Sequence, residues 1–226
     1  MAKITWAGQA CFQISVSNSM SAGRQAKDNQ ANIVIDPFDE KIGLKTPHFE
    51  ADILLVTHQH QDHNNVKDVR GSYFLIDSPG EYEVKGIFIR GIDSFHDDNQ
   101  GKERGKNIIY TIEADDIRFC HLGDLGQKQL TSEQLEKIGS VDVLMIPVGG
   151  IYTINCHEAA KIIGQIEPKM VIPMHYELPK LNIKLDSVDK FLKSMGKNSI
   201  EPQDKLTVKA SSLPKEGETE IVLLKP

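Results

Sequence analysis

Residues 57–63 read Thr-His-Gln-His-Gln-Asp-His, which brings three imidazoles and one carboxylate into a very short segment. The apolar run 53–56 precedes them, and side chains two residues apart on a strand point to the same side, so His58 and His60 should face one point. Asp62 and His63 follow where the chain turns. Imidazole nitrogens and carboxylate oxygens are the ligands that zinc and related divalent metals take. A solvated loop rich in histidine is the alternative, but the position directly after a buried-looking strand favours a metal site.

Further ligands must come from other parts of the chain, and three candidates follow strand-like runs. His96 follows the run 87–89, Asp124 follows 117–120, and His175 follows 170–173. Titratable residues at strand ends, where loops gather over a sheet, are typical of active sites on such scaffolds. We therefore expect these three side chains to complete the metal site.

Short strand-like runs dominate the sequence, and a few helices separate them. Asp115-Asp116 between two runs predicts a tight hairpin. This alternation favours an α/β or α+β fold with helices covering sheets. The predicted strands are 4–6, 11–16, 33–35, 53–56, 73–76, 87–89, 108–112, 117–120, 141–146, 170–173, 206–208 and 221–224.

Three segments have the start signals of helices. Thr131 with Gln134 and Asn155 with Glu158 are spaced as capping boxes, and Asp186 is expected to open the third helix. The helices are expected to span about 131–139, 155–165 and 186–196.

Composition limits the classes of function. The chain has 226 residues, a net charge of −6 and an estimated pI of 5.8, so we expect a small-molecule substrate rather than nucleic acid. No apolar stretch reaches the roughly 18 residues of a membrane helix. Three widely spaced cysteines and the absence of a signal-peptide pattern predict a cytoplasmic protein with reduced thiols. We expect one domain over residues 1–226, with a polar loop insertion at about 17–32.

The sequence resembles the metallo-β-lactamase superfamily in several motifs that occur in the family's order. Local details in 121–126, 147–153 and 173–176 look most like the branch of the ascorbate-6-phosphate lactonases, the N-acylphosphatidylethanolamine phospholipases D and many zinc-dependent hydrolases. The motifs are Asp36 in Ile-Asp-Pro, the His-x-His-x-Asp-His of 58–63, His96, Gly123-Asp124 and His175.

The resemblance implies a four-layer αββα sandwich with a dinuclear metal centre at one edge. His58, His60 and His96 would hold the first metal and Asp62, His63 and His175 the second, while Asp124 would bridge both and Asp36 would orient a ligand from behind. The metals would be two divalent ions, with zinc favoured and manganese or iron as alternatives.

The chemistry implied is metal-dependent hydrolysis of an ester, lactone or phosphoester bond. A hydroxide shared by two metals can attack a carbonyl or phosphoryl centre at neutral pH. The catalytic residues would be Asp62 and Asp124, together with His121. A nuclease of the same superfamily and a non-catalytic metal-binding or regulatory module are the alternatives.

Four further residues are candidates for contacts around the centre. His121 precedes Asp124 by three residues and fits three roles: metal ligand, proton donor or substrate contact, or structural residue. Tyr152 and Thr153 follow a glycine pair and are candidates to line the site. Relatives in this branch often carry a histidine where this chain has Gln9, which keeps hydrogen-bonding capacity but does not titrate near neutral pH.

Overall fold

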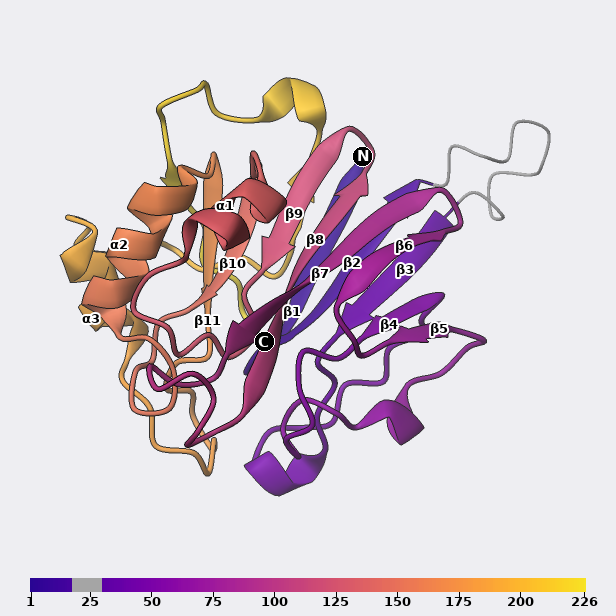
Figure 1. Cartoon of the computed structure of the whole chain (residues 1–226), viewed down its shortest axis with the longest axis horizontal. Helices are drawn as coiled ribbons and strands as arrows, with labels where there is room; N and C mark the ends of the chain where they lie inside the picture. Colours follow the sequence, from indigo (N-terminus) through magenta and orange to yellow (C-terminus); the bar gives the residue numbers. More distant parts are fainter. Residues whose placement is uncertain (18–29) are drawn as a thin grey trace.

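The computed structural model describes residues 1–17 and 30–226, and its strands form two mixed sheets that face each other (Figure 1). The first sheet has the order β12-β1-β2-β3-β4-β5 and the second the order β13-β11-β10-β9-β8-β7-β6. The strands of the first sheet are β1 (Ala2–Gly8), β2 (Cys11–Ser17), β3 (Gln30–Ile35), β4 (Ile53–Leu55), β5 (Phe74–Ile76) and β12 (Leu206–Val208). Those of the second are β6 (Gly80–Val84), β7 (Ile87–Phe95), β8 (Lys106–Ala114), β9 (Ile117–His121), β10 (Val143–Pro147), β11 (Met170–Met174) and β13 (Glu220–Ile221).

The main hydrophobic core lies between the two sheets. On β3, Ile33 and Ile35 belong to this core, whereas Val34 between them belongs to a smaller cluster on the outer face of the sheet. Successive strand side chains point to opposite faces, so an apolar run that is buried on both sides needs a cover on each. The expected four-layer sandwich has a cover on the outer side of each sheet.

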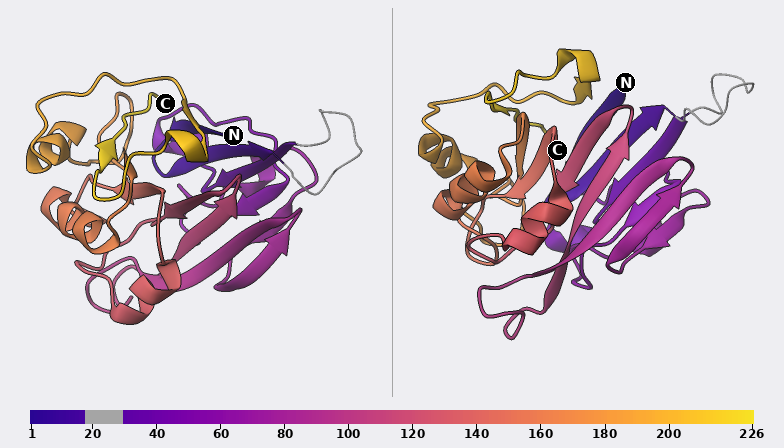
Figure 2. Two further views of the ribbon diagram at one scale, coloured as in Figure 1. Left: turned by 90° about the horizontal axis from the view of Figure 1, so that it is seen from above. Right: turned by 45° about the horizontal axis from the view of Figure 1, so that its top comes forward.

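Three α-helices lie on the outer side of the second sheet (Figure 2), where α1 contacts β7 and α2 packs against α3. They are α1 (Ser132–Ile138), α2 (Cys156–Ile166) and α3 (Val188–Ser194). The predicted capping boxes of α1 and α2 are confirmed, because Thr131 and Asn155 are the N-caps. The prediction for α3 is wrong by one residue: Ser187 is the N-cap, and the Asp186 carboxylate pairs instead with Lys190 one turn ahead.

The outer face of the first sheet has a thinner cover. Phe49, Val66 and Tyr73 pack on its outward-facing residues, and Val66 begins the short 3₁₀ helix Val66–Asp68. A second 3₁₀ helix, Glu40–Ile42, lies near the end of β3. On this side the helical layer of the sandwich consists of such short turns and loops.

Most predicted strands are present, with differences at particular positions. β6 was not among the predicted runs, and 221–224 contributes a strand only at Ile221. The hairpin at Asp115-Asp116 is confirmed, with both residues in the left-handed conformation at φ 55° and 59°.

The polar insertion predicted for 17–32 falls mainly on residues 18–29, which lie outside the described residues. Its predicted edges were too wide, because Ser17 ends β2 and residues 30–32 already belong to β3. In the ranges 1–17 and 30–226, no helix combines the length and apolarity that crossing a bilayer requires.

The strand directions explain how distant residues meet at one edge. β9, β10 and β11 run parallel, and β7 runs in the same direction as β9 because both are antiparallel to β8. The carboxyl ends of β7, β9 and β11 therefore lie at one edge of the second sheet, and the loops that follow them carry His96, Asp124 and His175. The loop after β4 of the first sheet carries the 57–63 motif.

Candidate metal centre

The seven predicted ligand residues converge into two neighbouring groups. Within each group, one ligand atom per residue lies within 4.8 Å of all the others. The groups are His58, His60 and His96, and Asp62, His63, Asp124 and His175. The division matches the two coordination shells that the sequence motifs imply.

Asp124 lies between the two groups. Its Oδ2 is 3.2 Å from Nε2 of His63, of His96 and of His175, and 4.0 Å from Nε2 of His58. His63 and His175 belong to one group and His96 and His58 to the other, so a single carboxylate oxygen contacts imidazoles from both. A carboxylate in this position can bridge two cations.

A buried hydrogen-bond chain orients two of the imidazoles. Asp36 accepts from the Thr57 amide (2.8 Å), the Thr57 hydroxyl (2.7 Å) and Nδ1 of His63 (2.9 Å). The Thr57 hydroxyl, having donated to Asp36, accepts from Nδ1 of His58 at 2.9 Å. Both rings therefore carry a proton on Nδ1 and turn Nε2 toward the centre, where that nitrogen can bind a metal ion.

The unsatisfied atoms of the site fit a metal. Among the described residues, His58 Nε2, His63 Nε2 and Asp124 Oδ1 are buried and have no hydrogen-bond partner. Unpaired buried polar atoms are costly, so native proteins rarely keep them without a function. Burial and the neighbouring His63 lower the pKa of His58 to about 2, which keeps its imidazole neutral and able to bind a cation.

In the second group, unlike at His58, the surroundings of His63 favour its protonated form in the metal-free protein. Burial opposes a charge on His63, but the carboxylates of Asp124, Asp62 and Asp36 outweigh it and raise its pKa well above the usual value. Burial likewise opposes the charge on Asp124, but His175 and His63 hold its pKa well below the usual range. In the metal-free protein, the positive charge of protonated His63 thus balances the carboxylates that a metal ion would otherwise neutralise.

Zinc binding at pH 7 is expected to release about one proton per chain, because the metal takes the Nε2 position that the His63 proton occupies. Calorimetry in buffers of different ionisation enthalpy measures this number. The raised pKa also means that protonated His63 stabilises the metal-free fold below about pH 6.5. That stabilisation is lost as the pH rises through the pKa in the folded protein. If zinc binding took up protons, or if it neither released nor took up protons, this charge balance would be contradicted.

Close backbone approaches build the loops around the site. A Cβ on Gly126 would lie 2.4 Å from the backbone of His96, and one on Gly149 would lie 2.1 Å from the His175 carbonyl oxygen. Only glycine permits these contacts. His175 itself has a φ of 52°, a left-handed conformation that costs about 1 to 3 kcal/mol in a non-glycine residue. Its amide donates to the carbonyl of Gln9 at 3.1 Å, which ties this turn to the loop between β1 and β2.

The Gln9 side chain contacts a proposed ligand directly. It is fully buried, and its Nε2 donates to Oδ2 of Asp62 at 2.9 Å. The carbonyl of Gln9 also accepts from Nε1 of Trp6 at 3.0 Å, so the residue is held from both sides. Gln9 therefore lies beside the metal centre, where it orients a carboxylate.

Gln9→Ala is expected to weaken the second metal site by roughly 10- to 100-fold, the usual effect of removing a hydrogen bond to a ligand. Gln9→His can keep a donor to Asp62, so it should hold the full metal content and alter turnover instead. Titration with a competing chelator measures the affinities, with Gln13→Ala as the matched control, because Gln13 only donates to the Glu50 carbonyl at the surface. An unchanged affinity in Gln9→Ala would show that Asp62 needs no such support.

His121 belongs to neither ligand group. Its ring is fully buried: Nδ1 accepts from the amide of Gly123 at 3.1 Å, and Nε2 faces the carbonyl of Ala10 at 3.0 Å. Because Nδ1 accepts, Nε2 carries the proton and donates. Both ring nitrogens thus form hydrogen bonds with the backbone. Of the three roles predicted for His121, this arrangement fits that of a structural residue.

A cavity of about 510 Å³ opens onto the ligands. Tyr152 lines it, whereas Thr153 is half-buried and its hydroxyl donates to the carbonyl of Ile154 at 3.4 Å. Arg104 and Lys184 also line this cavity, and neither was predicted. The complete lining is His60, Asp62, His96, Arg104, Asp124, Tyr152, His175, Asn182, Ile183 and Lys184.

Another residue missed from the sequence positions Asp124. The Asn107 amide is fully buried, and its Oδ1 accepts from the Asp124 amide at 2.9 Å while its Nδ2 donates to the Leu122 carbonyl at 2.9 Å. Asn107 thereby fixes the turn that presents the Asp124 carboxylate. Its position directly before the apolar run 108–110 was the one available signal.

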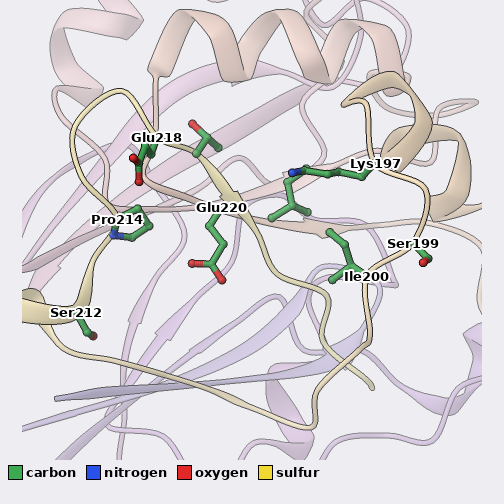
Figure 3. A pocket seen from close by; sticks show the side chains of 9 residues that line it. Lys197, Ser199, Ile200, Ser212, Pro214, Glu218 and Glu220 are labelled. Atoms are coloured by element: carbon green, nitrogen blue, oxygen red, sulfur yellow. The ribbon is translucent and has the colours of Figure 1, made fainter.

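A larger hollow of about 590 Å³ lies beneath the C-terminal segment, remote from this chemistry (Figure 3). Its wall combines Lys197 with Glu218 and Glu220, and none of the seven ligand residues belongs to it. The cavity at the sheet edge is therefore the candidate active site.

Two facing sheets with clustered histidines and aspartates at one edge define the class of metal-binding α/β sandwich proteins. Residues 3–175 match the family model of the β-lactamase superfamily domain. The chain therefore belongs to the metallo-β-lactamase superfamily.

Individual relatives agree with this membership. A UPF0173 metal-dependent hydrolase from Thermococcus onnurineus is 29% identical over 203 residues, which cover 78% of this chain and 85% of the relative. A solved structure from Thermotoga maritima, described as a Zn-dependent hydrolase of the superfamily, is 38% identical with a TM-score of 0.75 over the whole of both chains. The diiron β-hydroxylase CmlA from Streptomyces venezuelae shares the fold alone, at 13% identity and a TM-score of 0.61, over 92% of this chain and 54% of CmlA. These relatives do not single out the lactonase and phospholipase branch.

Proposed function

We propose that the protein is a metal-dependent hydrolase with two divalent ions. His58, His60 and His96 would hold one ion, and Asp62, His63 and His175 the other, with Asp124 between them. The observation that carries the proposal is the position of Asp124 Oδ2, which lies 3.2 Å from Nε2 atoms of both groups.

Zinc is the ion we favour, with manganese and iron as alternatives, because a given site with nitrogen and oxygen ligands generally binds zinc more tightly than manganese or iron. When bound, the ions would supply an activated water nucleophile and would polarise the bond to be broken. The other groups have supporting roles: Asp36 and Thr57 fix two ligand rings, Gln9 orients Asp62, and His121 holds the loop before Asp124.

The bond we propose is an ester, lactone or phosphoester of a small molecule. A cavity of about 510 Å³ has the size of a small-molecule site, and a chain with a net charge of −6 is a poor match for nucleic acid. All three cysteines are free and buried, in keeping with a cytoplasmic protein.

A panel of small esters, lactones and phosphoesters tests this function on zinc-loaded protein. Turnover of at least one class is expected, and it should be lost on chelation and regained when zinc is restored. Two bound metals without turnover of any class would favour the non-catalytic metal-binding module instead.

A further inference from the structure

The cavity at the metal centre has basic residues opposite the ligands. Arg104 comes from the loop after β7, and Lys184 comes from the segment between β11 and α3. They share a cavity with His60, Asp62, Asp124 and other ligands, so a small molecule bound at the centre would meet both cations. The chain as a whole is acidic, at −6, and two cations gathered here run against that overall charge.

The loop that carries Arg104 is held firmly. The Asp97 carboxylate is 3% exposed and accepts four backbone amides, from Asn99 (2.8 Å), Gly101 (2.8 Å), Glu103 (3.0 Å) and Arg104 (2.8 Å). The amide of Arg104 itself is thus fixed by a buried charge. A side chain on such a loop can reach its ligand with little loss of conformational entropy.

The guanidinium group of Arg104 is also oriented, by a contact with an aromatic ring. Its Cζ lies 5.8 Å from the centre of the Tyr152 ring, a cation–π contact at the mouth of the cavity. Its carboxylate neighbour among the described residues is Glu103, at 3.9 Å and with 59% of the side chain exposed. This weak surface pair leaves the guanidinium available to a ligand.

Lys184 is positioned by the backbone on either side of it. The Asn182 amide donates to the Ile42 carbonyl at 2.7 Å, and the Asp186 amide donates to the Gly149 carbonyl at 2.8 Å. Within residues 1–17 and 30–226, no carboxylate lies within 4.0 Å of the ammonium group of Lys184. The Lys184 side chain is exposed, so its ammonium group is open to a ligand at the cavity.

Arg104 also lines a second hollow, of about 370 Å³. The carboxylates of this hollow are Asp77 and Asp93, and its other cation, Lys106, already pairs with Asp93 at 3.8 Å. On the Lys184 side, an anion would meet both Arg104 and Lys184, and two divalent ions at the ligands would make that side more positive.

We propose that the substrate carries an anionic group, a carboxylate or a phosphate, which Arg104 and Lys184 bind while the bond to be hydrolysed lies at the ligand side of the cavity. This inference rests on the proposed function and specifies its substrate class. Arg104 and Lys184 would act as specificity residues, and Asp97 as a positioning residue for Arg104.

Binding of three matched acids to zinc-loaded protein tests the proposal by calorimetry. Butyrate, succinate and 3-phosphonopropionate share one carboxylate and differ in the far end, which is a methyl, a carboxylate or a phosphonate. Succinate or 3-phosphonopropionate should bind at least about tenfold more tightly than butyrate, the value of a charge-assisted hydrogen bond. The tighter of the two identifies the anion that the site prefers.

The preference should fall to about twofold or less in the double variant Arg104→Ala with Lys184→Ala, while the zinc content stays unchanged. Lys161→Ala, at an exposed position on α2, is the matched control and should keep the preference. Equal affinities in the unmodified protein, or a preference that survives the double substitution, would overturn the proposal. Because binding needs no turnover, a preference without hydrolysis would refute the proposed function alone, and hydrolysis without a preference would refute the anion site alone.

Discussion

Asp124→Ala is expected to lose metal from both sites and to lower turnover by at least about 10³-fold, a loss of several kcal/mol of charge stabilisation. The reason is geometric. One oxygen of Asp124 contacts His63, His96 and His175 at 3.2 Å, so its removal takes a ligand from each group at once. Elemental analysis of the purified variant, together with its rate on the best substrate of the panel, measures both effects.

The control for this variant is Asp204→Ala, since 89% of the Asp204 side chain is exposed and it pairs with Lys225 at the surface, at 3.8 Å. It should keep metal content and rate. Thermal unfolding of the metal-free proteins separates misfolding from metal loss. A folded Asp124→Ala protein with full metal content and activity would show that Asp124 does not bridge the two groups.

Removal of the metals with a chelator is expected to lower the turnover rate by at least about 10³-fold. Alkylation of the thiols should leave the turnover rate of the folded protein nearly unchanged. All three cysteines are buried. Burial raises the pKa of the thiols of Cys11 and Cys120, so neither forms a reactive thiolate near neutral pH. Rates before and after each reagent, and again after zinc is restored, measure the two effects.

Mass spectrometry shows how many thiols have reacted, and zinc analysis shows whether the centre is intact. Suppose that a cysteine reagent inactivates the enzyme completely while both metals remain bound and the fold is intact. That result would contradict the metal-dependent mechanism and would favour a mechanism with a cysteine thiol as the nucleophile.

Local signals in the sequence were sufficient for much of the fold. Thr131 and Asn155 cap their helices as predicted, because a capping box depends only on residues three positions apart. Asp186 is not the cap because its carboxylate pairs with Lys190, and Ser187 takes the N-cap position without a side-chain hydrogen bond to the helix. β6 was missed because Gly80-Glu81-Tyr82-Glu83-Val84 has little apolar character, and its pairing with β7 supplies what the sequence pattern lacks.

The ligands could be found from the sequence because each follows a strand, and the superfamily motifs set their order. The residues that were missed depend on contacts between distant segments. Asn107 bonds to Asp124, 17 positions away, and Arg104 and Lys184 meet only where two loops close one cavity. His121 shows the reverse case: its place beside the motif suggested chemistry, but its hydrogen bonds to Ala10 and Gly123 can be seen only in the folded chain.

Anomalous diffraction at the zinc edge from crystals of zinc-loaded protein is the most direct test of the dinuclear centre. The expected result is two peaks per chain, one among His58, His60 and His96 and the other among Asp62, His63 and His175, both beside Asp124. A single peak per chain in the presence of excess zinc, or peaks away from these residues, would contradict the two-metal site.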